Sequence, residues 1–212
     1  MNEELLLPLF PEVVFVKTLN HISDDEMNKL KQSVERLDYM TSGDDLKERD
    51  NTSLASKNIK LFDLPEFVYI KETIMNEFNS FKNKKLKYTN NDFIFTTSWS
   101  TKTKPGQSGE YHNHTNCFYS GIFYIDSNDM SGDISFENFN SKSFQLIPSE
   151  YNLNNGRSFK VGVKKKMIIF FPSYMYHKIH KNNSMITRYS LAFNFLPVGK
   201  LGRDDSTLVL DL

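Results

Sequence analysis

The sequence predicts an α+β protein in which helices come first and a β-rich core follows. Apolar residues recur at about every 3.6 positions in the N-terminal part, and from Asp92 onward they alternate with polar residues at every second position. The 212 residues, 39% of them hydrophobic, suffice for one buried core. We therefore expect a single domain over 1–212, with helical N-terminal support in 1–91, a β-sandwich or barrel in 92–200 and a tail in 201–212.

The first elements follow from short local signals. A β-branched run at 13–16 predicts a strand. Ser23, with Glu26 three residues later, forms a capping box that predicts a helix reaching about Leu37. Residues 40–60 are polar and lack a pattern, so we expect a loop there.

A second helix is expected after Asp63, which would cap it, with Pro65 in its first turn. This helix carries an apolar stripe that we expect to pack against the core. The stripe consists of Val68, Ile70, Ile74, Met75, Phe78 and Phe81.

The C-terminal part is expected to form strands separated by Gly, Asn, Ser and Pro turns. These strands are predicted at 93–99, 118–125, 133–136, 167–171 and 188–195. In the first of them, alternation places Phe93, Phe95, Thr97 and Trp99 on one face. No internal repeat or linker divides the chain.

Charge and cysteine content exclude several classes. Lys and Arg total 26, as do Asp and Glu, so no broad basic surface is available for a nucleic-acid backbone. The local basic runs at 82–87 and 164–166 are more typical of solvated turns. The single Cys117 excludes an internal disulfide and fits a reducing compartment. Without a long apolar run or a secretory pattern, we expect a cytoplasmic protein that does not bind membranes.

Three histidines have spacing typical of a metal site. His112 and His114 are one residue apart, so in an extended segment both side chains point to the same side. His177 follows the strand predicted at 167–171. Imidazoles suit Fe(II), Zn, Cu or Ni, so the ligands alone do not select the metal. The alternative is a polar loop with a solvated His177, and we expect His180 beside such a site or on the surface.

Arg188 opens a strand with two different faces. Positions 189, 191, 193 and 195 are large and apolar, whereas Arg188, Ser190, Ala192 and Asn194 are small or polar. A buried guanidinium needs an anionic partner, and Ser190 is placed to donate to the same anion. An exposed strand face with an ordinary charge is the alternative, although the chain otherwise favours Lys over Arg.

The residues resemble the Fe(II)- and 2-oxoglutarate-dependent oxygenases, in particular a small bacterial and phage group related to the prolyl-hydroxylase branch. The matching blocks are 99–106, 111–114, 120–125, 132–136, 169–173 followed by His177, and 188–190. The resemblance implies a double-stranded β-helix, or jelly roll, with the N-terminal helices packed on it. A phage-encoded member would act in the host cytoplasm.

The same resemblance implies roles for individual residues. His112 and His177 would bind the iron, Arg188 would pair with the distal carboxylate of 2-oxoglutarate, and Ser190 and Tyr124 would assist it. Most members have His-x-Asp, and here His114 stands in the place of the Asp. We therefore expect His114 as the third iron ligand. A carboxylate from Asp126, Asp133 or Glu137 is the alternative.

The implied activity is that of a dioxygenase of the hydroxylase type. It would use Fe(II), 2-oxoglutarate and O2, with ascorbate as an optional further cofactor, and release succinate and CO2. The primary substrate is left open: a protein or peptide side chain is favoured by analogy over a small molecule, and nucleic acid is disfavoured. A metal- or anion-binding jelly roll without turnover is the rival class. A homodimer is compatible with the sequence, which does not decide the oligomeric state.

Overall fold

The computed structural model describes residues 5, 10–41, 51–138 and 146–211. In this part of the chain two antiparallel sheets and two α-helices are present, which confirms a mixed fold with few helices and mostly antiparallel strands. The helices are α1 (Asp24–Glu35) and α2 (Val68–Phe81). The strands are β1 (Phe15–Thr18), β2 (Tyr39–Thr41), β3 (Leu54–Ser56), β4 (Asp92–Thr103), β5 (Tyr119–Asp126), β6 (Ile134–Glu137), β7 (Ser158–Val161), β8 (Met167–Pro172), β9 (Tyr176–Ile179), β10 (Arg188–Leu201) and β11 (Leu208–Leu210).

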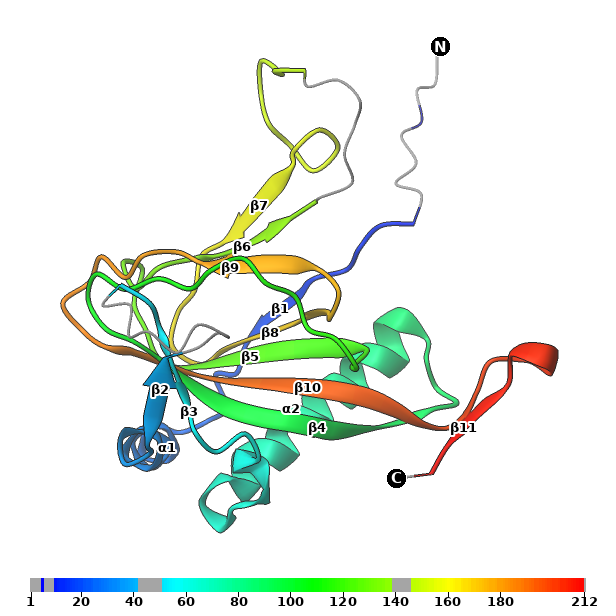
Figure 1. Cartoon of the computed structure of the whole chain (residues 1–212), viewed down its shortest axis with the longest axis horizontal. Helices are drawn as coiled ribbons and strands as arrows, with labels where there is room; N and C mark the ends of the chain where they lie inside the picture. Colours follow the sequence, from blue (N-terminus) through cyan, green and yellow to red (C-terminus); the bar gives the residue numbers. More distant parts are fainter. Residues whose placement is uncertain (1–4, 6–9, 42–50, 139–145, 212) are drawn as a thin grey trace.

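The large sheet has the order β1-β8-β5-β10-β4-β3-β2, with β11 paired to the end of β10. The small sheet has the order β7-β6-β9 and lies across from the β5–β8 part of the large sheet (Figure 1). The first 91 residues thus contribute three strands as well as the two helices. The three-residue strands β2 and β3 lie where we expected a loop, so that prediction was wrong for the described part of 40–60. Residues 42–50 lie outside the described residues.

Helix α1 begins where its capping box predicts. The Glu26 backbone N–H donates to Ser23 Oγ at 3.2 Å, and the Ser23 backbone N–H donates to Glu26 Oε2 at 2.8 Å. Helix α2 begins later than predicted, at Val68, because two 3-10 turns precede it. Asp63 belongs to the first of these turns and does not cap the helix.

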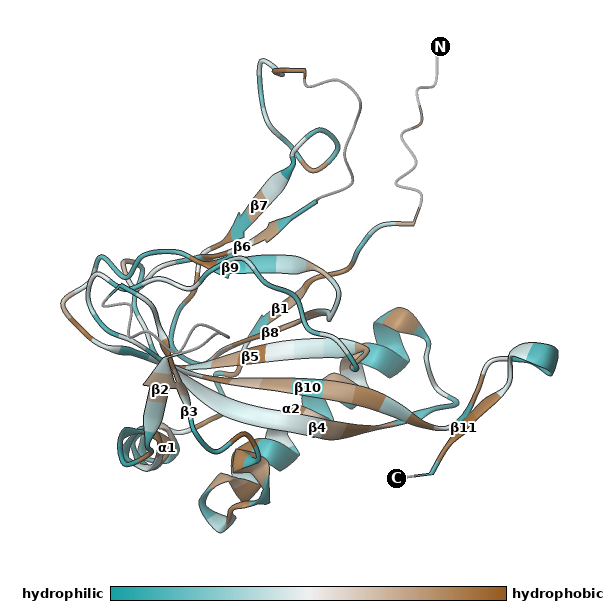
Figure 2. Ribbon diagram, viewed as in Figure 1, coloured by the Kyte–Doolittle hydropathy of each residue, from teal (hydrophilic) through white to brown (hydrophobic). Residues whose placement is uncertain are grey.

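The outer face of the large sheet forms the main core. Helices α1 and α2 cover this face and bury an aromatic cluster between themselves and the strands (Figure 1). The predicted stripe of α2 packs there, with the exception of Val68, which is exposed. Tyr189, Leu191, Phe193 and Phe195 also point into this core, as the alternation in β10 predicts. Figure 2 shows the corresponding hydrophobic stretches along β10 and β4.

The inner face of the large sheet packs against the small sheet. Here a second, smaller cluster joins Ile122 and Tyr124 of β5 and Ile169 and Phe171 of β8 to Phe136 of β6. The small residues of β10 face this side and leave room for a cavity. The outer face of the sheet therefore carries most of the core packing, whereas the inner face lines a cavity that can hold a ligand.

Strand β4 does not keep one side throughout its length. Phe95 pairs with Phe195 and Thr97 pairs with Asn194, so Thr96 is an extra residue in the ladder, a β-bulge. As a result Phe95 packs with the outer core, whereas Thr97, Trp99 and Thr101 line the inner cavity. The prediction that Phe93, Phe95, Thr97 and Trp99 share one face was wrong, because the bulge shifts the alternation by one residue.

Candidate active site

A cavity of about 510 Å³ opens on the inner face of the large sheet. Its walls come from β4, β5, β10 and the β2–β3 region on one side and from the 109–114 segment and β9 on the other. The lining is mostly apolar or hydroxyl-bearing, and among the described lining residues Glu110 is the only carboxylate. Three histidines line this cavity: His112, His114 and His177.

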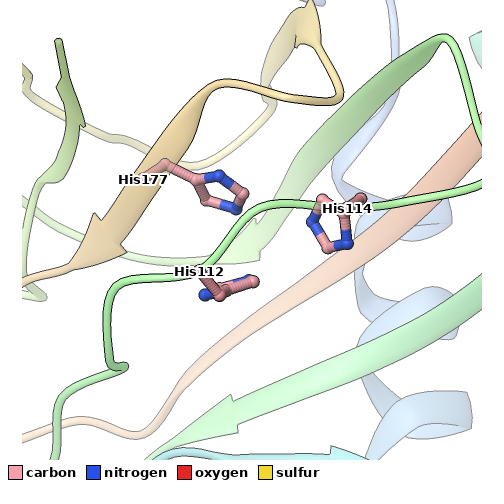
Figure 3. Close-up of side chains that lie close together, drawn as sticks. All are labelled: His112, His114 and His177. Carbon is pink, nitrogen blue, oxygen red and sulfur yellow. The ribbon is translucent and has the colours of Figure 1, made fainter. Parts of the chain in front are cut away.

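The three histidines converge, and their candidate ligand atoms lie within 4.8 Å of one another. His177 is on β9, and His112 lies beside it through a backbone bridge in which each N–H donates to the other's carbonyl, at 2.9 and 3.1 Å. His114 is held by its own backbone N–H, which donates to the Ser173 carbonyl at 2.9 Å. All three rings lie in one small region (Figure 3). No described Asp or Glu joins this group.

Backbone carbonyls orient two of the rings. His112 Nδ1 lies 2.9 Å from the Glu110 carbonyl, and His177 Nδ1 lies 3.0 Å from the Met175 carbonyl. A carbonyl only accepts, so each Nδ1 carries the proton and each Nε2 lone pair is available to a metal. Hydrogen bonds of this kind fix the tautomer and the direction of a ligating imidazole.

The environment keeps the buried histidines neutral. Burial, with a smaller contribution from His112, lowers the pKa of His177 to about 3. The same two causes lower the pKa of His114 to about 4. Neutral imidazole is the form that binds a metal, so at neutral pH no proton has to leave these two rings first.

The inner face of the sheet leads from the histidines to Arg188 in rows of paired residues. Across β4, β10 and β5 these rows are Thr97 with Asn194 and Ser120, Trp99 with Ala192 and Ile122, Thr101 with Ser190 and Tyr124, and finally Thr103 with Arg188. Trp99 lies at the histidine end, with its ring 5.6 Å from that of His114. Ser190 lines the cavity. Tyr124, in the same row, and Arg188, in the following row, lie just beyond the residues that line it.

Arg188 is completely buried at this far end. Its Nη1 donates to the carbonyls of Ser131 and Gly132 at 3.2 and 2.8 Å, and its Nη2 donates to Thr103 Oγ1 at 3.0 Å. Its Nε has no hydrogen-bond partner. Because an unpartnered buried donor is costly, an acceptor that is not part of the described chain would stabilise this end.

Tyr124 has the same deficiency. Its hydroxyl is buried without a partner, and its ring lies 5.9 Å from the Arg188 guanidinium carbon. Burial raises the pKa of Tyr124 to about 12, so the hydroxyl keeps its proton and can donate. Two unpartnered donors side by side, one of them cationic, suit a carboxylate.

Residues 97–194 match the family model described as "Putative 2OG-Fe(II) oxygenase", where 2OG denotes 2-oxoglutarate. This segment of the chain is similar to the 2OG-Fe(II) oxygenases. The matched segment contains the three converging histidines and Arg188. None of the curated proteins matches the chain by sequence.

Several solved structures have a fold similar to that of this chain. A 2OG-Fe(II) oxygenase family oxidoreductase from Burkholderia pseudomallei matches with a TM-score of 0.61 at 11% identity, over 86% of this chain and 84% of the other. A prolyl-4-hydroxylase from Pseudomonas putida matches with 0.60 at 13%, over 86% and 92%. HygX from Streptomyces hygroscopicus, with nickel, 2-oxoglutarate and hygromycin B bound, matches with 0.59 at 12%, over 88% and 83%.

The carboxylates considered as alternative metal ligands lie outside the group of three histidines. Asp126 forms a salt bridge to Lys31 of α1 at 2.7 Å. Glu137 of β6 accepts from the Tyr111 hydroxyl, and Asp133 lies just before β6, where its backbone carbonyl accepts from the His180 N–H. None of the three belongs to the described group of converging ligands.

Some site residues were missed from the sequence. Trp99, Thr103 and Tyr111 were named there only as parts of strands or motifs, if at all. Tyr111 lines the cavity, and its hydroxyl donates to Glu137 at the end of β6. This bond ties the segment that carries His112 and His114 to the small sheet. The strand alternation contains a signal for Thr103, since it opposes Arg188, but the signal needs the register, which the sequence does not give.

Two lysines of the basic runs have partners within the described chain. Lys82 is buried, and its Nζ donates to Asn83 Oδ1 and to the carbonyls of Tyr88 and Asn91. Lys166 forms a salt bridge to Asp24 at 2.9 Å. In the described residues, no helix is long and apolar enough to cross a membrane.

Proposed function

We propose that this protein is a non-haem Fe(II)- and 2-oxoglutarate-dependent dioxygenase of the hydroxylase type, built on a jelly roll formed by its two sheets. The observation that carries the proposal is the pairing of two sites along one inner face. Three imidazoles converge at one end, and at the other the Nε of Arg188 and the hydroxyl of Tyr124 are buried without a hydrogen-bond partner. A cavity of about 510 Å³ lies next to both.

The donor set fits a divalent transition metal. His112, His114 and His177 would hold the iron through Nε2 in the first and third, whose Nδ1 atoms already face carbonyls. Iron(II) with 2-oxoglutarate supplies the oxidation of a C–H bond by O2, coupled to conversion of the cosubstrate to succinate and CO2. The absence of a carboxylate leaves one more positive charge at the site, which favours a dianionic cosubstrate.

The other end fits the distal carboxylate. Arg188 Nε and the Tyr124 hydroxyl would donate to it, and the Ser190 hydroxyl on the same strand face would add a third donor. Thr103 and the carbonyls of Ser131 and Gly132 hold the guanidinium so that its fork does not need to be ordered on binding. The apolar part of the lining would exclude water from the reacting C–H bond.

The cavity lining indicates which class of primary substrate to test first. The cavity lining is apolar and hydroxyl-bearing, and within the described residues it contains no Lys or Arg that would hold a phosphate. This favours an uncharged group, such as a peptide side chain or a neutral small molecule, over a nucleotide.

The test is an anaerobic titration followed by a turnover assay. Fe(II) and 2-oxoglutarate together should give a weak visible charge-transfer band, and admission of O2 should release succinate. A folded protein that binds Fe(II) but gives neither the band nor succinate would refute the use of 2-oxoglutarate. A screen of peptides, amino acids and oligonucleotides for stimulated succinate release would then identify the substrate class.

A set of three histidines without a carboxylate also suits zinc or nickel, which favours a metal-binding protein without turnover as a second candidate. Metal analysis of protein purified without added metal separates the two functions. Stoichiometric zinc that Fe(II) does not displace, together with no succinate release, would support the second candidate.

A further inference from the structure

Three buried polar side chains and the half-buried Thr97 form a chain of hydrogen bonds beneath the histidine end of the cavity, and we refer to it as the polar ladder. Its members are Ser173, Ser120, Asn194 and Thr97, and each comes from a different part of the large sheet. Ser173 and Ser120 are 1% exposed and Asn194 is 8% exposed. Polar groups buried to this degree in a sheet rich in Phe and Ile need an explanation.

The direction of every bond in the ladder can be assigned. The Ser120 hydroxyl donates to Asn194 Oδ1 at 2.7 Å, so it must accept from the Ser173 hydroxyl 2.9 Å away. Asn194 Nδ2 donates to Thr97 Oγ1 at 2.9 Å. Removing one hydroxyl in the middle leaves two buried groups without partners, so the ladder acts as a unit.

The ladder ends at residues that belong to the site. Thr97 lines the cavity. Ser173 follows the last residue of β8, its carbonyl accepts from the His114 N–H at 2.9 Å, and its own N–H donates to the Phe118 carbonyl at 3.1 Å. Ser173 thus fixes the backbone on both sides of the turn that carries His114.

Stabilisation of the sheet alone does not explain the polar ladder. The outer face of the same strands is packed by Phe193, Phe195 and their neighbours without a comparable ladder among the described residues. A pair of matched apolar residues would fill positions 120 and 194 at no loss of stability, since buried polar pairs contribute little net free energy. The ladder lies where His114 has to be positioned.

We infer that Ser120 and Asn194 are positioning residues that act through Ser173 to hold His114 in its place beside His112 and His177. Carbonyls accept from the rings of His112 and His177, and within the described residues no carbonyl accepts from the ring of His114, so the place of His114 depends on its backbone. The inference rests on the proposed metal site and identifies which residues outside the three histidines control it.

The experiment is a Co(II) titration, because the visible spectrum of Co(II) reports the number and arrangement of its ligands without any turnover. The variant is Ser120→Ala, and Ser98→Ala is its matched control. Ser98 is equally buried, lies on the outer side of β4 and accepts from the Phe62 N–H at 2.9 Å, away from the histidines. Thermal melting of the metal-free proteins measures the loss of stability in each.

Ser120→Ala should weaken Co(II) binding by roughly tenfold or more and alter the spectrum, as for other residues that hold metal ligands in place. Ser98→Ala should bind Co(II) like the wild type. Ser120→Thr, which keeps the hydroxyl, should recover most of the affinity.

A double-mutant cycle with His114→Ala decides whether the effect passes through this histidine. In the His114→Ala background, Ser120→Ala should cause no further weakening. Equal weakening in both backgrounds, or a Ser120→Ala protein with wild-type affinity and spectrum, would overturn the inference. If Ser120→Ala does not fold, Ser173→Ala replaces it, because it removes the terminal hydroxyl and keeps the carbonyl that binds His114. Wild-type protein that binds no Co(II) would refute the proposed function, and this inference with it.

Discussion

The two ends of the cavity are built in opposite ways. At the histidine end, His112 is exposed, His114 is half-buried and His177 is buried, and the ligands come from a loop segment and a short strand. At the other end both side chains are buried: Arg188 is the first residue of β10, and Tyr124 lies within β5 opposite Ser190 of β10. The proposed metal end is therefore open to solvent at His112, whereas Arg188 and Tyr124 at the proposed anion end are not exposed.

This comparison predicts that changes at the two ends affect different ligands. The largest effect is expected at the metal end. His177→Ala should lower Fe(II) affinity by more than about a hundredfold, because even residues that only support a metal ligand contribute about 10- to 100-fold. Anaerobic Fe(II) titration measures it.

The matched control for that change is His180→Ala. His180 lies three residues away, and its Nε2 contacts Ser135 Oγ at 3.0 Å outside the converging group. Its removal should leave Fe(II) affinity within about twofold of the wild type. Equal losses in the two variants would contradict the assignment of His177 as a ligand.

The second effect is expected at the anion end. Arg188→Lys keeps the charge but loses the fork, so 2-oxoglutarate affinity should fall roughly 10- to 100-fold, the value of about one or two charge-assisted hydrogen bonds. Fe(II) affinity should change by less than about threefold. Quenching of the single Trp99, which lies beside His114, can follow both ligands in separate titrations. The exposed Arg157→Lys serves as the control, and a parallel loss of both affinities would make Arg188 a purely structural residue.

A smaller effect is expected from Tyr124→Phe. The change removes only an unpartnered hydroxyl, so 2-oxoglutarate affinity should fall about five- to tenfold while the metal-free protein becomes no less stable. Thermal melting and the same fluorescence titration give the two numbers. Tyr119→Phe, on the same strand but on the outer side, should not alter 2-oxoglutarate affinity. A Tyr124→Phe protein that is destabilised and binds 2-oxoglutarate normally would show that the hydroxyl serves the fold.

The smallest effect is expected at the rim of the metal end. Glu137→Ala removes the acceptor of the Tyr111 hydroxyl and loosens the segment that carries His112, so Fe(II) affinity should fall by about two- to fivefold. Glu137→Gln keeps an acceptor oxygen and should retain most of the affinity in the same anaerobic titration. An undiminished affinity in Glu137→Ala would mean that the backbone bridge to His177 is sufficient.

The sequence predicted those parts of the fold whose cause is local. The capping box of α1 and the alternation in β10 depend on neighbouring residues, and both are confirmed. The strands β2 and β3 were missed because three residues are too short for a period to appear, and they are held by pairing, β3 with β4 and β2 with β3. The start of α2 was predicted too early because Asp63 has the composition of a cap but belongs to a preceding turn.

The convergence of the histidines was partly accessible. The spacing of His112 and His114 indicates a shared side, but their approach to His177 depends on a backbone bridge between segments 65 residues apart, which spacing alone does not reveal. The sequence also indicated that Arg188 needs a partner. It did not reveal that two backbone carbonyls and Thr103 hold most of its fork, because these contacts depend on the turn at 131–132 and on the register of β4.

The bulge at Thr96 has a consequence for how this protein tolerates change. Strand β4 contributes residues to the packed outer core before Thr96 and to the inner cavity after it, and this single extra residue makes the change of face possible. Deleting Thr96 would leave Phe95 and Thr97 on their present faces, because they pair with successive residues of β10. If Thr96 instead took a regular place in the ladder, Thr97, Trp99 and Thr101 would turn toward the helices, and Ser98 and Ser100 would replace them in the cavity. The bulge is therefore as much a part of the design of the site as the identity of any side chain in it.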